Sequence, residues 1–316
     1  MRIIHSDSHD VYFNLATEQY LLHEQSEDIL MLWQSEYAVV CGKHQNACAE
    51  ANYAFCKENN IHIARRLSGG GTVFHDLGNV NFTFVKALSE GMERAVDYKR
   101  YLEPIREVLS NLGIQTTYSE RDDLLLNGLK ISGNAQHIYQ KGLKGLHHGT
   151  LLYDSDLGSL NTAIHSEGTY EGKSVPSNRS KVTNIREWTD LGATSLFIGK
   201  LCHQLESLYG VTSKPLTDIE KSRCQQISDE KFSQESWILG YSPRYIHERS
   251  FLKDGERLHL TMMVHQDEIK NCVITDDQKQ VVYPSESEQL IGRALRLITL
   301  KQTFTDFSEK ELLNFF

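Results

Sequence analysis

The stretch RRLSGGGTVFHDLGNVNFTF, residues 65–84, carries the residue types that are best suited to bind an anion. Glycine has no Cβ, so a ligand can approach the backbone closely, and successive exposed N–H groups can hold phosphate oxygens. Arg65 and Arg66 add guanidinium groups that suit phosphate or carboxylate. Neither G-x-x-x-x-G-K-[ST] nor G-x-G-x-x-G is present. We interpret the stretch as an anion-binding loop, and the alternative is a tight turn with two solvated arginines.

A second group of chemically useful residues lies in DDLLLNGLKISGNAQ. Asn127-Gly128 is the preferred two-residue type I′ turn between two strand-like runs. Such a turn pairs position 126 with 129, 125 with 130 and 123 with 132, which places Asp123, Lys130 and Ser132 on one face. An ammonium group and a carboxylate on rigid strands are well placed for chemistry, although a lysine on a strand more often faces solvent.

Two histidine pairs need a separate interpretation. His147 and His148 are adjacent, and adjacent strand residues point to opposite faces, so we expect a packing residue and a pocket wall rather than a metal site. His75-Asp76 resembles a general base with an orienting carboxylate, but neighbours in sequence rarely orient each other. We therefore expect His75 to position the loop and line a pocket.

The segments that position these residues predict a fold with both strands and helices. Short apolar or alternating runs at 28–34, 37–43, 61–67 and 79–86 have the length of strands. The spacing of apolar residues over 100–113 predicts a helix that ends at Gly113. Asn14 is the predicted N-cap of a helix over 15–25, and residues 165–184 are predicted to form a long polar loop.

The pattern changes near residue 240. Residues 249–277 predict a hairpin with an Asp-Gly turn and one further strand. Residues 285–300 predict a helix with a Ser285/Glu288 capping box. We therefore predict two domains, a larger one over residues 1–241 and a small α+β domain over residues 242–316.

The composition excludes several classes of protein. The chain has 316 residues, of which 40% are hydrophobic and 24% charged, and a formal net charge of −9. Such a chain is a typical globular protein, and without a basic face it is not expected to bind nucleic acid. It has no apolar run long enough to span a membrane and no signal-peptide pattern. The six cysteines form no C-x-x-C pair, so we predict free thiols and a cytoplasmic location.

Taken in order, five segments resemble the motifs of lipoate–protein ligases. RRLSGGGTVFHDLGNVNFTF is similar to the family signature R-R-x-S-G-G-G-x-V-x-H-D-x-G-N-x-x-F. LWQSEYAVVCGKHQNACAEAN, LKISGNAQ, LHHGTLLYDSDL and SNRSKVTNI resemble four further segments of the family. The resemblance covers roughly residues 5–190 in register. It implies an α+β catalytic domain like that of biotin protein ligases, with a mixed or antiparallel sheet, flanking helices and a small C-terminal domain.

The resemblance also implies roles for individual residues. Lys130 matches the family lysine that contacts the acyl carbonyl and the α-phosphate, and it is the expected catalytic residue for both substrates. Asp123 matches an acidic residue that is expected to bind magnesium with ATP or to position the lysine. The other positions that match binding motifs are Arg66, Gly71, Thr72, Val73, Phe74, Arg179 and Lys181 for ATP, and Ser68, Gly69, Gly70, His75 and His148 for lipoate.

The implied activity is a two-step, ATP- and magnesium-dependent lipoylation that salvages free lipoate. Lipoate is activated to lipoyl-AMP, and the lipoyl group then passes to one lysine of a lipoyl domain. The expected acceptors are the E2 subunits of 2-oxoacid dehydrogenases and the glycine-cleavage H protein, and the enzyme is expected to be a monomer.

Three alternatives stay open at this point. They are a transferase that uses only preformed lipoyl-AMP, an octanoyl or lipoyl transferase with a cysteine nucleophile, and a lipoate-binding protein without activity. The second needs a reactive thiol near the lysine, and Cys41 is the one candidate, since none lies between Cys56 and Cys202. The chain departs from the family pattern at Cys41 and also at His137, where some ligases have an arginine.

Overall fold

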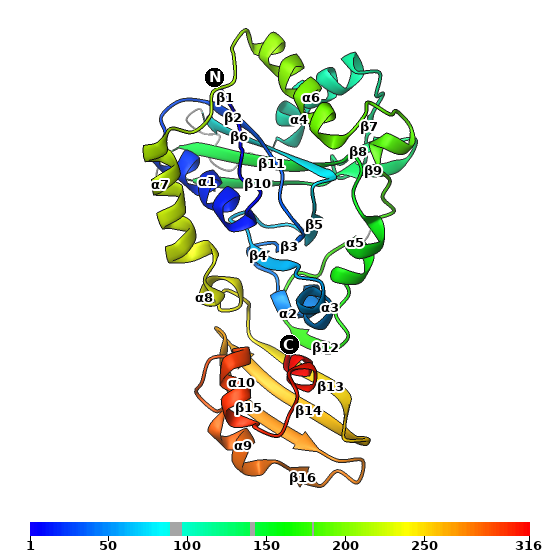
Figure 1. The fold of residues 1–316 in the computed structure, drawn as a ribbon, viewed down its shortest axis with the longest axis vertical. Helices are drawn as coiled ribbons and strands as arrows, with labels where there is room; N and C mark the ends of the chain where they lie inside the picture. Colours follow the sequence, from blue (N-terminus) through cyan, green and yellow to red (C-terminus); the bar gives the residue numbers. More distant parts are fainter. Residues whose placement is uncertain (89–96, 140–142, 179) are drawn as a thin grey trace.

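The structure is a computed structural model that describes residues 1–88, 97–139, 143–178 and 180–316. Strands and helices intermix before residue 240, and a meander of long strands followed by short helices forms the rest (Figure 1). The strands are β1 (Arg2–His5), β2 (Ile29–Trp33), β3 (Ala38–Cys41), β4 (His62–Arg65), β5 (Val73–His75), β6 (Asn79–Ala87), β7 (Thr117–Tyr118), β8 (Leu124–Leu126), β9 (Leu129–Ser132), β10 (Asn134–Tyr139), β11 (Lys144–Leu152), β12 (Thr169–Gly172), β13 (Tyr245–Lys253), β14 (Glu256–His265), β15 (Glu268–Thr275) and β16 (Val281–Val282). The helices are α1 (Val11–Glu24), α2 (Ala47–Glu50), α3 (Tyr53–Glu58), α4 (Tyr98–Asn111), α5 (Leu157–Ala163), α6 (Thr194–Tyr209), α7 (Asp218–Ile227), α8 (Glu235–Ile238), α9 (Pro284–Gln289), α10 (Leu297–Thr303) and α11 (Glu309–Leu312), with short turns η2 (Ile185–Glu187), η3 (Ser228–Phe232) and η4 (Leu313–Phe315).

The largest sheet before residue 240 has the order β1-β2-β6-β11-β10. β1 and β2 run parallel, whereas the other neighbours are antiparallel. Helices α4 and α6 cover one face, and α1 and α7 lie on the other (Figure 1). Because both faces are covered, β2 is buried along its whole length and its sequence is a continuous apolar run. The predicted α+β class with a mixed sheet and flanking helices is confirmed.

A three-stranded sheet of order β4-β3-β5 carries the glycine-rich stretch. β3 is parallel to β4 and antiparallel to β5. The chain that leaves β4 after Arg65 must therefore cross the end of β3 before it enters β5 at Val73. Residues 66–72, which we call the glycine loop, make this crossing. Two strands that share one central neighbour thus hold both ends of the loop.

The predicted hairpin around Lys130 forms within a sheet of order β7-β8-β9. Asn127 and Gly128 have φ angles of 48° and 81°, the positive values that a type I′ turn requires. The predicted pairs 126–129 and 125–130 are confirmed. The third pair is wrong, because a bulge shifts the register and Ser132 faces Leu124 instead of Asp123.

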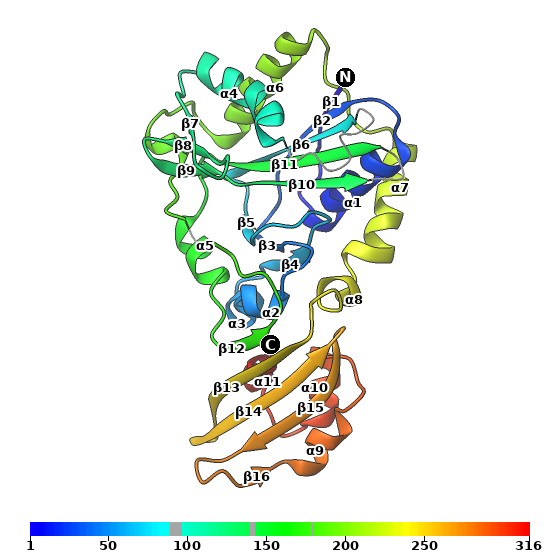
Figure 2. The same cartoon turned by 180° about the vertical axis from the view of Figure 1, so that it is seen from behind.

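The carboxyl-terminal strands β13, β14, β15 and β16 form an antiparallel sheet, and the predicted Asp254-Gly255 turn joins the first two. β12 adds to the edge of this sheet by pairing with β13, although it belongs to the stretch 165–184 that we predicted to be a loop (Figure 2). That prediction is wrong over 169–172. The segment TYEG has no alternating pattern, and its strand form depends on the edge that β13 offers. The domain boundary between 241 and 242 stays a prediction.

Two predicted helix starts are wrong. Asp10, not Asn14, caps α1 by accepting hydrogen bonds from the backbone N–H groups of Tyr12 and Phe13 at 2.7 and 3.2 Å. Asn14 is buried inside the helix. Residues 285–300 form parts of two short helices instead of one, because Gly292, at φ 81°, lies between them, and no capping box forms. The predicted end of α4 is confirmed, with Gly113 directly after its C-cap.

The carboxyl-terminal sheet shares an apolar core with the small sheet of the glycine loop. Val39 and Cys48 belong to the same buried cluster as Tyr245 and Phe315. All six cysteines are free, as predicted, and the structure shows that all six are buried. In the described ranges, every helix is too short or too polar to cross a membrane.

Candidate functional site

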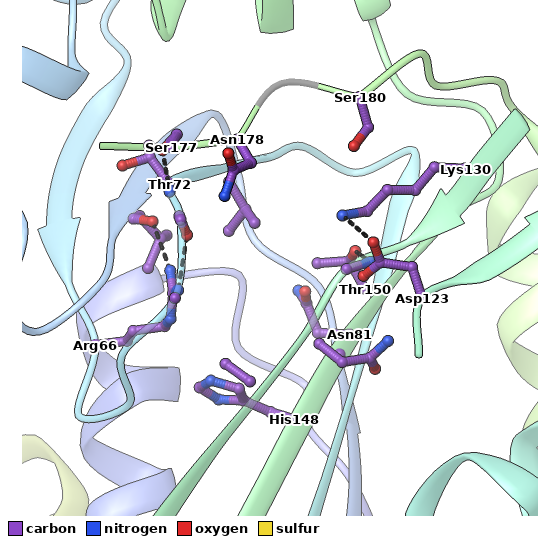
Figure 3. Close-up of a pocket in the computed structure, with 18 of the residues that line it drawn as sticks. Arg66, Thr72, Asn81, Asp123, Lys130, His148, Thr150, Ser177, Asn178 and Ser180 are labelled. Atoms are coloured by element: carbon purple, nitrogen blue, oxygen red, sulfur yellow. Dashed lines mark hydrogen bonds and ion pairs between the residues drawn. The ribbon is translucent and has the colours of Figure 1, made fainter. Parts of the chain in front are cut away.

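A cavity of about 300 Å³ lies between the glycine loop and the main sheet. The hairpin of Lys130 forms one wall, and residues 175–178 and 180, which we call the roof segment, close another side (Figure 3). The anion-binding loop and the lysine hairpin, which are about 60 residues apart in sequence, meet at this cavity. The structure therefore brings both predicted groups of residues to one cavity.

The side chain of Lys130 points into this cavity and forms an ion pair with Asp123, with 2.9 Å between Nζ and the carboxylate oxygen (Figure 3). Both side chains keep a small exposed fraction, 23% for the lysine and 16% for the aspartate, so both are accessible to a ligand. The predicted proximity of the two groups is confirmed. The backbone of Lys130 is also fixed, because its N–H donates to Lys181 O at 3.0 Å and its carbonyl accepts from Thr183 N at 3.1 Å.

Arg65 does not take part in the cavity, and its predicted role as an anion ligand is wrong. Its side chain is fully buried and does not line the cavity. Its N–H groups are used instead to join β4 to the chain around α8 and to the segment after β3. The acceptors are the carbonyl oxygens of Gly42, Lys43, Gln45, Trp237 and Ile238 and the hydroxyl of Ser242.

Arg66 lines the cavity, as predicted, but it mainly shapes the glycine loop. Its guanidinium donates to the carbonyl oxygens of Gly69 and Gly71 at 2.6 and 2.7 Å and to Ser68 Oγ at 3.0 Å. Burial lowers the pKa of Arg66 to about 10, so the group is still charged at neutral pH. It therefore supplies positive charge beside the loop while it holds the loop closed.

The residues of the glycine loop contribute unequally to the cavity. Gly70, Gly71 and Thr72 line it, as does Val73 of β5, whereas Phe74 of β5 lines an adjoining cavity that also contacts Lys130. Ser68 is fully buried, and neither it nor Gly69 lies in the cavity wall. Gly70 has a φ of 85°, a conformation that favours glycine.

His148 forms the wall at the far side of the cavity from Lys130 (Figure 3). Its Nδ1 lies 2.9 Å from the buried carboxylate of Glu18, and its Nε2 lies 2.6 Å from Ser68 Oγ. Ser68 thus contacts the cavity-lining His148 but does not itself line the cavity, unlike the predicted direct contact with lipoate. The apolar part of the wall includes Leu15, Trp33, Val40, Val73 and Ala135.

His75 lines the same cavity and packs against Trp33, with 5.3 Å between the ring centroids. Burial lowers the pKa of His75 to about 3, so the ring is neutral. Asp76 does not orient it, because its carboxylate accepts from the backbone N–H groups of Gly78 and Asp156 at 2.9 and 2.7 Å. The predicted place of His75 in the pocket wall is confirmed.

The adjacent residues His147 and His148 face opposite sides of the sheet, as predicted. His148 lines the cavity, whereas His147 is buried and stacks on Tyr101, with 4.9 Å between the ring centroids.

Lys181, a predicted ATP ligand, and His137, a departure from the family pattern, do not line the cavity. The side chain of Lys181 is exposed and does not line the cavity, although its backbone carbonyl accepts a hydrogen bond from Lys130 N. Arg179 lies outside the described residues. His137 is half-buried on β10 and is not part of the cavity wall.

Asn81, which no sequence motif singled out, also lines the cavity (Figure 3). Its Oδ1 accepts from Asn79 Nδ2 at 2.9 Å, and its own Nδ2 has no partner among the described residues. The alternation of Asn79, Asn81 and Thr83 with apolar residues was a usable signal, because it places three polar side chains on one face of a buried strand.

Asp123 is the only carboxylate among the cavity-lining residues that the structure describes. Within the same residues, no group of three His, Cys, Asp or Glu side chains could hold a metal ion. Mg²⁺ is commonly bound by one or two carboxylates together with the phosphates of a substrate. One carboxylate therefore fits a magnesium ion that enters with a nucleotide, and not a metal held by the protein alone.

Comparison with known proteins identifies the family of the chain. Residues 10–206 match the family model of the lipoyl protein ligase A/B catalytic domain. The chain is also 31% identical to a lipoate-protein ligase of Bacillus subtilis, over 96% of each chain. The chain belongs to the lipoyl protein ligase family.

Solved structures of lipoyl protein ligases have the same fold. A lipoate-protein ligase A that was solved with ATP bound has a TM-score of 0.65 and 24% identity, over 76% of this chain and 98% of that one. A bipartite lipoate protein ligase of Thermoplasma acidophilum, described with its E2 lipoyl domain, has a TM-score of 0.63 and 23% identity, over 76% of this chain and 96% of that one.

A tight backbone contact in this ligase-family chain gives a first prediction. A Cβ on Gly42 would lie 2.1 Å from the carbonyl oxygen of Gly70, so Gly42→Ala must displace the glycine loop. We expect it to lower kcat/KM for ATP by about tenfold, because a small displacement of positioning groups is costly. Gly69→Ala is the matched control, since a Cβ there meets no atom within 4 Å. Equal activity of the two variants in an ATP–pyrophosphate exchange assay would contradict the prediction.

Proposed function

We propose that the protein activates lipoate with ATP to lipoyl-AMP and transfers the lipoyl group to a lysine of lipoyl domains. The observation that carries this proposal is the place of Lys130, which lies in one cavity with the glycine loop and an apolar wall. A phosphate group and an acyl chain can be held on the two sides, and their reacting ends meet at a cation. Family membership supports the same activity.

In the first step, a carboxylate oxygen of lipoate attacks the α-phosphorus of ATP. The bond from that phosphorus to the bridging oxygen breaks, and pyrophosphate leaves with the electron pair. Negative charge grows on the α-phosphate oxygens during the attack, and the Lys130 ammonium group stabilises it in a largely enclosed site. Asp123 keeps the ammonium group oriented through the ion pair.

In the second step, the ε-amine of the acceptor lysine attacks the acyl carbon of lipoyl-AMP. An amide bond forms, and the bond from the acyl carbon to the phosphate oxygen breaks to release AMP. The same ammonium group of Lys130 stabilises the charge that develops on the acyl oxygen. One lysine therefore serves both steps, as the family motif implied.

We also propose a metal ion, acceptor proteins and a location for this enzyme. Asp123 would hold a magnesium ion that arrives with ATP, and this ion would neutralise phosphate charge. The proposed acceptors are the E2 subunits of 2-oxoacid dehydrogenases and the glycine-cleavage H protein, and the archaeal relative described with an E2 lipoyl domain supports this class. We further propose that the enzyme is a cytoplasmic monomer with a separate domain over 242–316.

The test of the proposed function measures the two steps separately. ATP–pyrophosphate exchange that depends on lipoate would establish the first step, and lipoylation of a purified E2 lipoyl domain would establish the second. A lipoyl domain whose acceptor lysine is replaced by arginine is the control. Transfer from supplied lipoyl-AMP without any exchange would reduce the proposal to a transferase. The absence of both activities would overturn it.

The variant Cys41→Ser tests the alternative that uses a cysteine nucleophile. Cys41 is fully buried, does not line the cavity, and burial raises the pKa of its thiol, so a reactive thiolate is not available. We expect Cys41→Ser to keep the rate of lipoyl transfer within about twofold, because no covalent step involves this residue. A loss of transfer in a folded variant, together with a trapped thioester in the unmodified protein, would contradict this expectation.

A further inference from the structure

The roof segment is attached to the rest of the site at one central residue. Val175, Pro176 and Asn178 are exposed, whereas Ser177 between them is half-buried. The hydroxyl of Ser177 donates to the carboxylate of Glu50 and accepts from Thr72 N at 2.8 Å. Its backbone N–H donates to the other oxygen of Glu50 at 3.2 Å.

Gln45 completes the attachment. Its Nε2 donates to Ser177 Oγ at 3.0 Å and to Val175 O at 3.2 Å. Its Oε1 accepts from Gly42 N and from Thr72 Oγ1, both at 2.9 Å. All four hydrogen-bonding positions of the Gln45 amide are therefore used, and the Ser177 hydroxyl uses its one donor and two acceptor positions.

The two anchoring side chains come from a rigid and buried part of the fold. Gln45 is 1% exposed and Glu50 is 9% exposed. Both flank or belong to the short helix α2, whose start Asn46 caps by accepting from Cys48 N at 3.1 Å. Neither side chain lines the cavity, so any effect on a substrate must pass through the lining residues that they contact, which are Ser177, Thr72 and Val175.

We propose that Gln45 and Glu50 are positioning residues that hold the roof segment over the cavity through Ser177. This arrangement of three residues is called the roof latch below. The inference rests on the proposed function, since its consequence is that the closed roof retains lipoyl-AMP until an acceptor lysine arrives. The latch also joins the roof to the glycine loop, because Thr72 belongs to that loop and contacts both Ser177 and Gln45.

The distal ends of the roof segment are fixed independently of the latch. On one side the chain continues from β12, which pairs with β13. On the other side Lys181 and Thr183 pair with the backbone of Lys130. Loss of the latch is therefore expected to free the middle of the segment without unfolding its ends or moving Lys130.

The test compares Ser177→Ala and Glu50→Gln with the unmodified protein in two measurements. Without substrates, amide hydrogen exchange in residues 173–178 should become about tenfold faster, because hydrogen bonds to a charged group are lost. With lipoate and ATP but no acceptor, the rate at which intact lipoyl-AMP is released from the protein should also rise about tenfold for the same reason. Ser177→Thr keeps the hydroxyl and should restore both values.

Controls separate the latch from general destabilisation. Glu58→Gln changes an exposed glutamate of α3 and should leave both measurements unchanged. Ser177 is half-buried in a loop with exposed neighbours, so Ser177→Ala remains informative even where Glu50→Gln, at a buried position, fails to fold. In a double-mutant cycle, the two substitutions should be non-additive, because they remove the same contact.

Two results would overturn the inference. The first is unchanged hydrogen exchange in 173–178 in Ser177→Ala, and the second is full additivity of the two substitutions. Hydrogen exchange needs no activity, so a failure of the proposed ligase function would leave this measurement readable. Faster exchange in a protein that makes no lipoyl-AMP would support the latch and refute only the function.

Discussion

Lys130→Ala is expected to lower the rate of lipoate-dependent ATP–pyrophosphate exchange by about 1,000-fold, since removal of a single group that stabilises transition-state charge costs this much in other enzymes. The reason is the place of the ammonium group in the cavity, next to Asp123 and between the glycine loop and the apolar wall. The binding of lipoate should change far less than the rate. The measurement is single-turnover formation of lipoyl-AMP at saturating ATP.

The stability of the same variant provides the control. The Lys130–Asp123 ion pair is partly exposed, so its loss should change the free energy of unfolding by less than about 1 kcal/mol. Lys181→Ala removes a motif lysine whose side chain is exposed and should leave the exchange rate nearly unchanged. If Lys130→Ala keeps most of the exchange activity, or Lys181→Ala loses it, Lys130 is not the catalytic lysine.

Arg65→Ala is expected to have the largest effect on stability. Its guanidinium is buried and donates to five backbone carbonyl groups and one hydroxyl, which belong to the segment after β3 and to the chain around α8. Without it, these acceptors are buried and unpaired, and a cavity is left. We expect the free energy of unfolding to fall by about 4 kcal/mol, because each unpaired buried polar group is costly.

Urea denaturation of Arg65→Ala and of the unmodified protein measures this effect. Arg257→Ala, at an exposed position of β14, is the matched control and should change the free energy of unfolding very little. A different result would contradict this prediction. An unchanged midpoint together with a raised KM for ATP would make Arg65 an anion ligand after all, as the sequence pattern first suggested.

Much of the candidate site follows from local rules and was therefore predictable. The period of two along a strand and the Asn127-Gly128 turn place Lys130 near Asp123, and the ion pair confirms it. The assignment of His75 and His148 to the pocket also came from sequence motifs, and both line the cavity. The predicted pairing of Ser132 was wrong because a bulge shifts the register, and the residues of the turn do not predict a bulge.

Other features depend on contacts between distant segments. β12 is a strand only because β13 offers an edge to it. The first residue of β13, Tyr245, comes 76 residues after the first residue of β12, Thr169. The roof latch joins Gln45 and Glu50 to Ser177, more than 120 residues away, and no local pattern connects them. Such long-range pairings are not encoded in propensities, because the partner decides whether they form.

Arg65 and Arg66 show most directly which features the sequence determines and which depend on the tertiary structure. The sequence by itself determined that Arg65 and Arg66, as neighbours at the end of a strand, point to opposite sides. Only the tertiary structure decided which side is the cavity, because that depends on where α8 and the main sheet pack against β4. Arg65 meets the buried carbonyl groups near α8, and Arg66 meets the glycine loop. One arginine thus stabilises the fold, and its neighbour shapes the site.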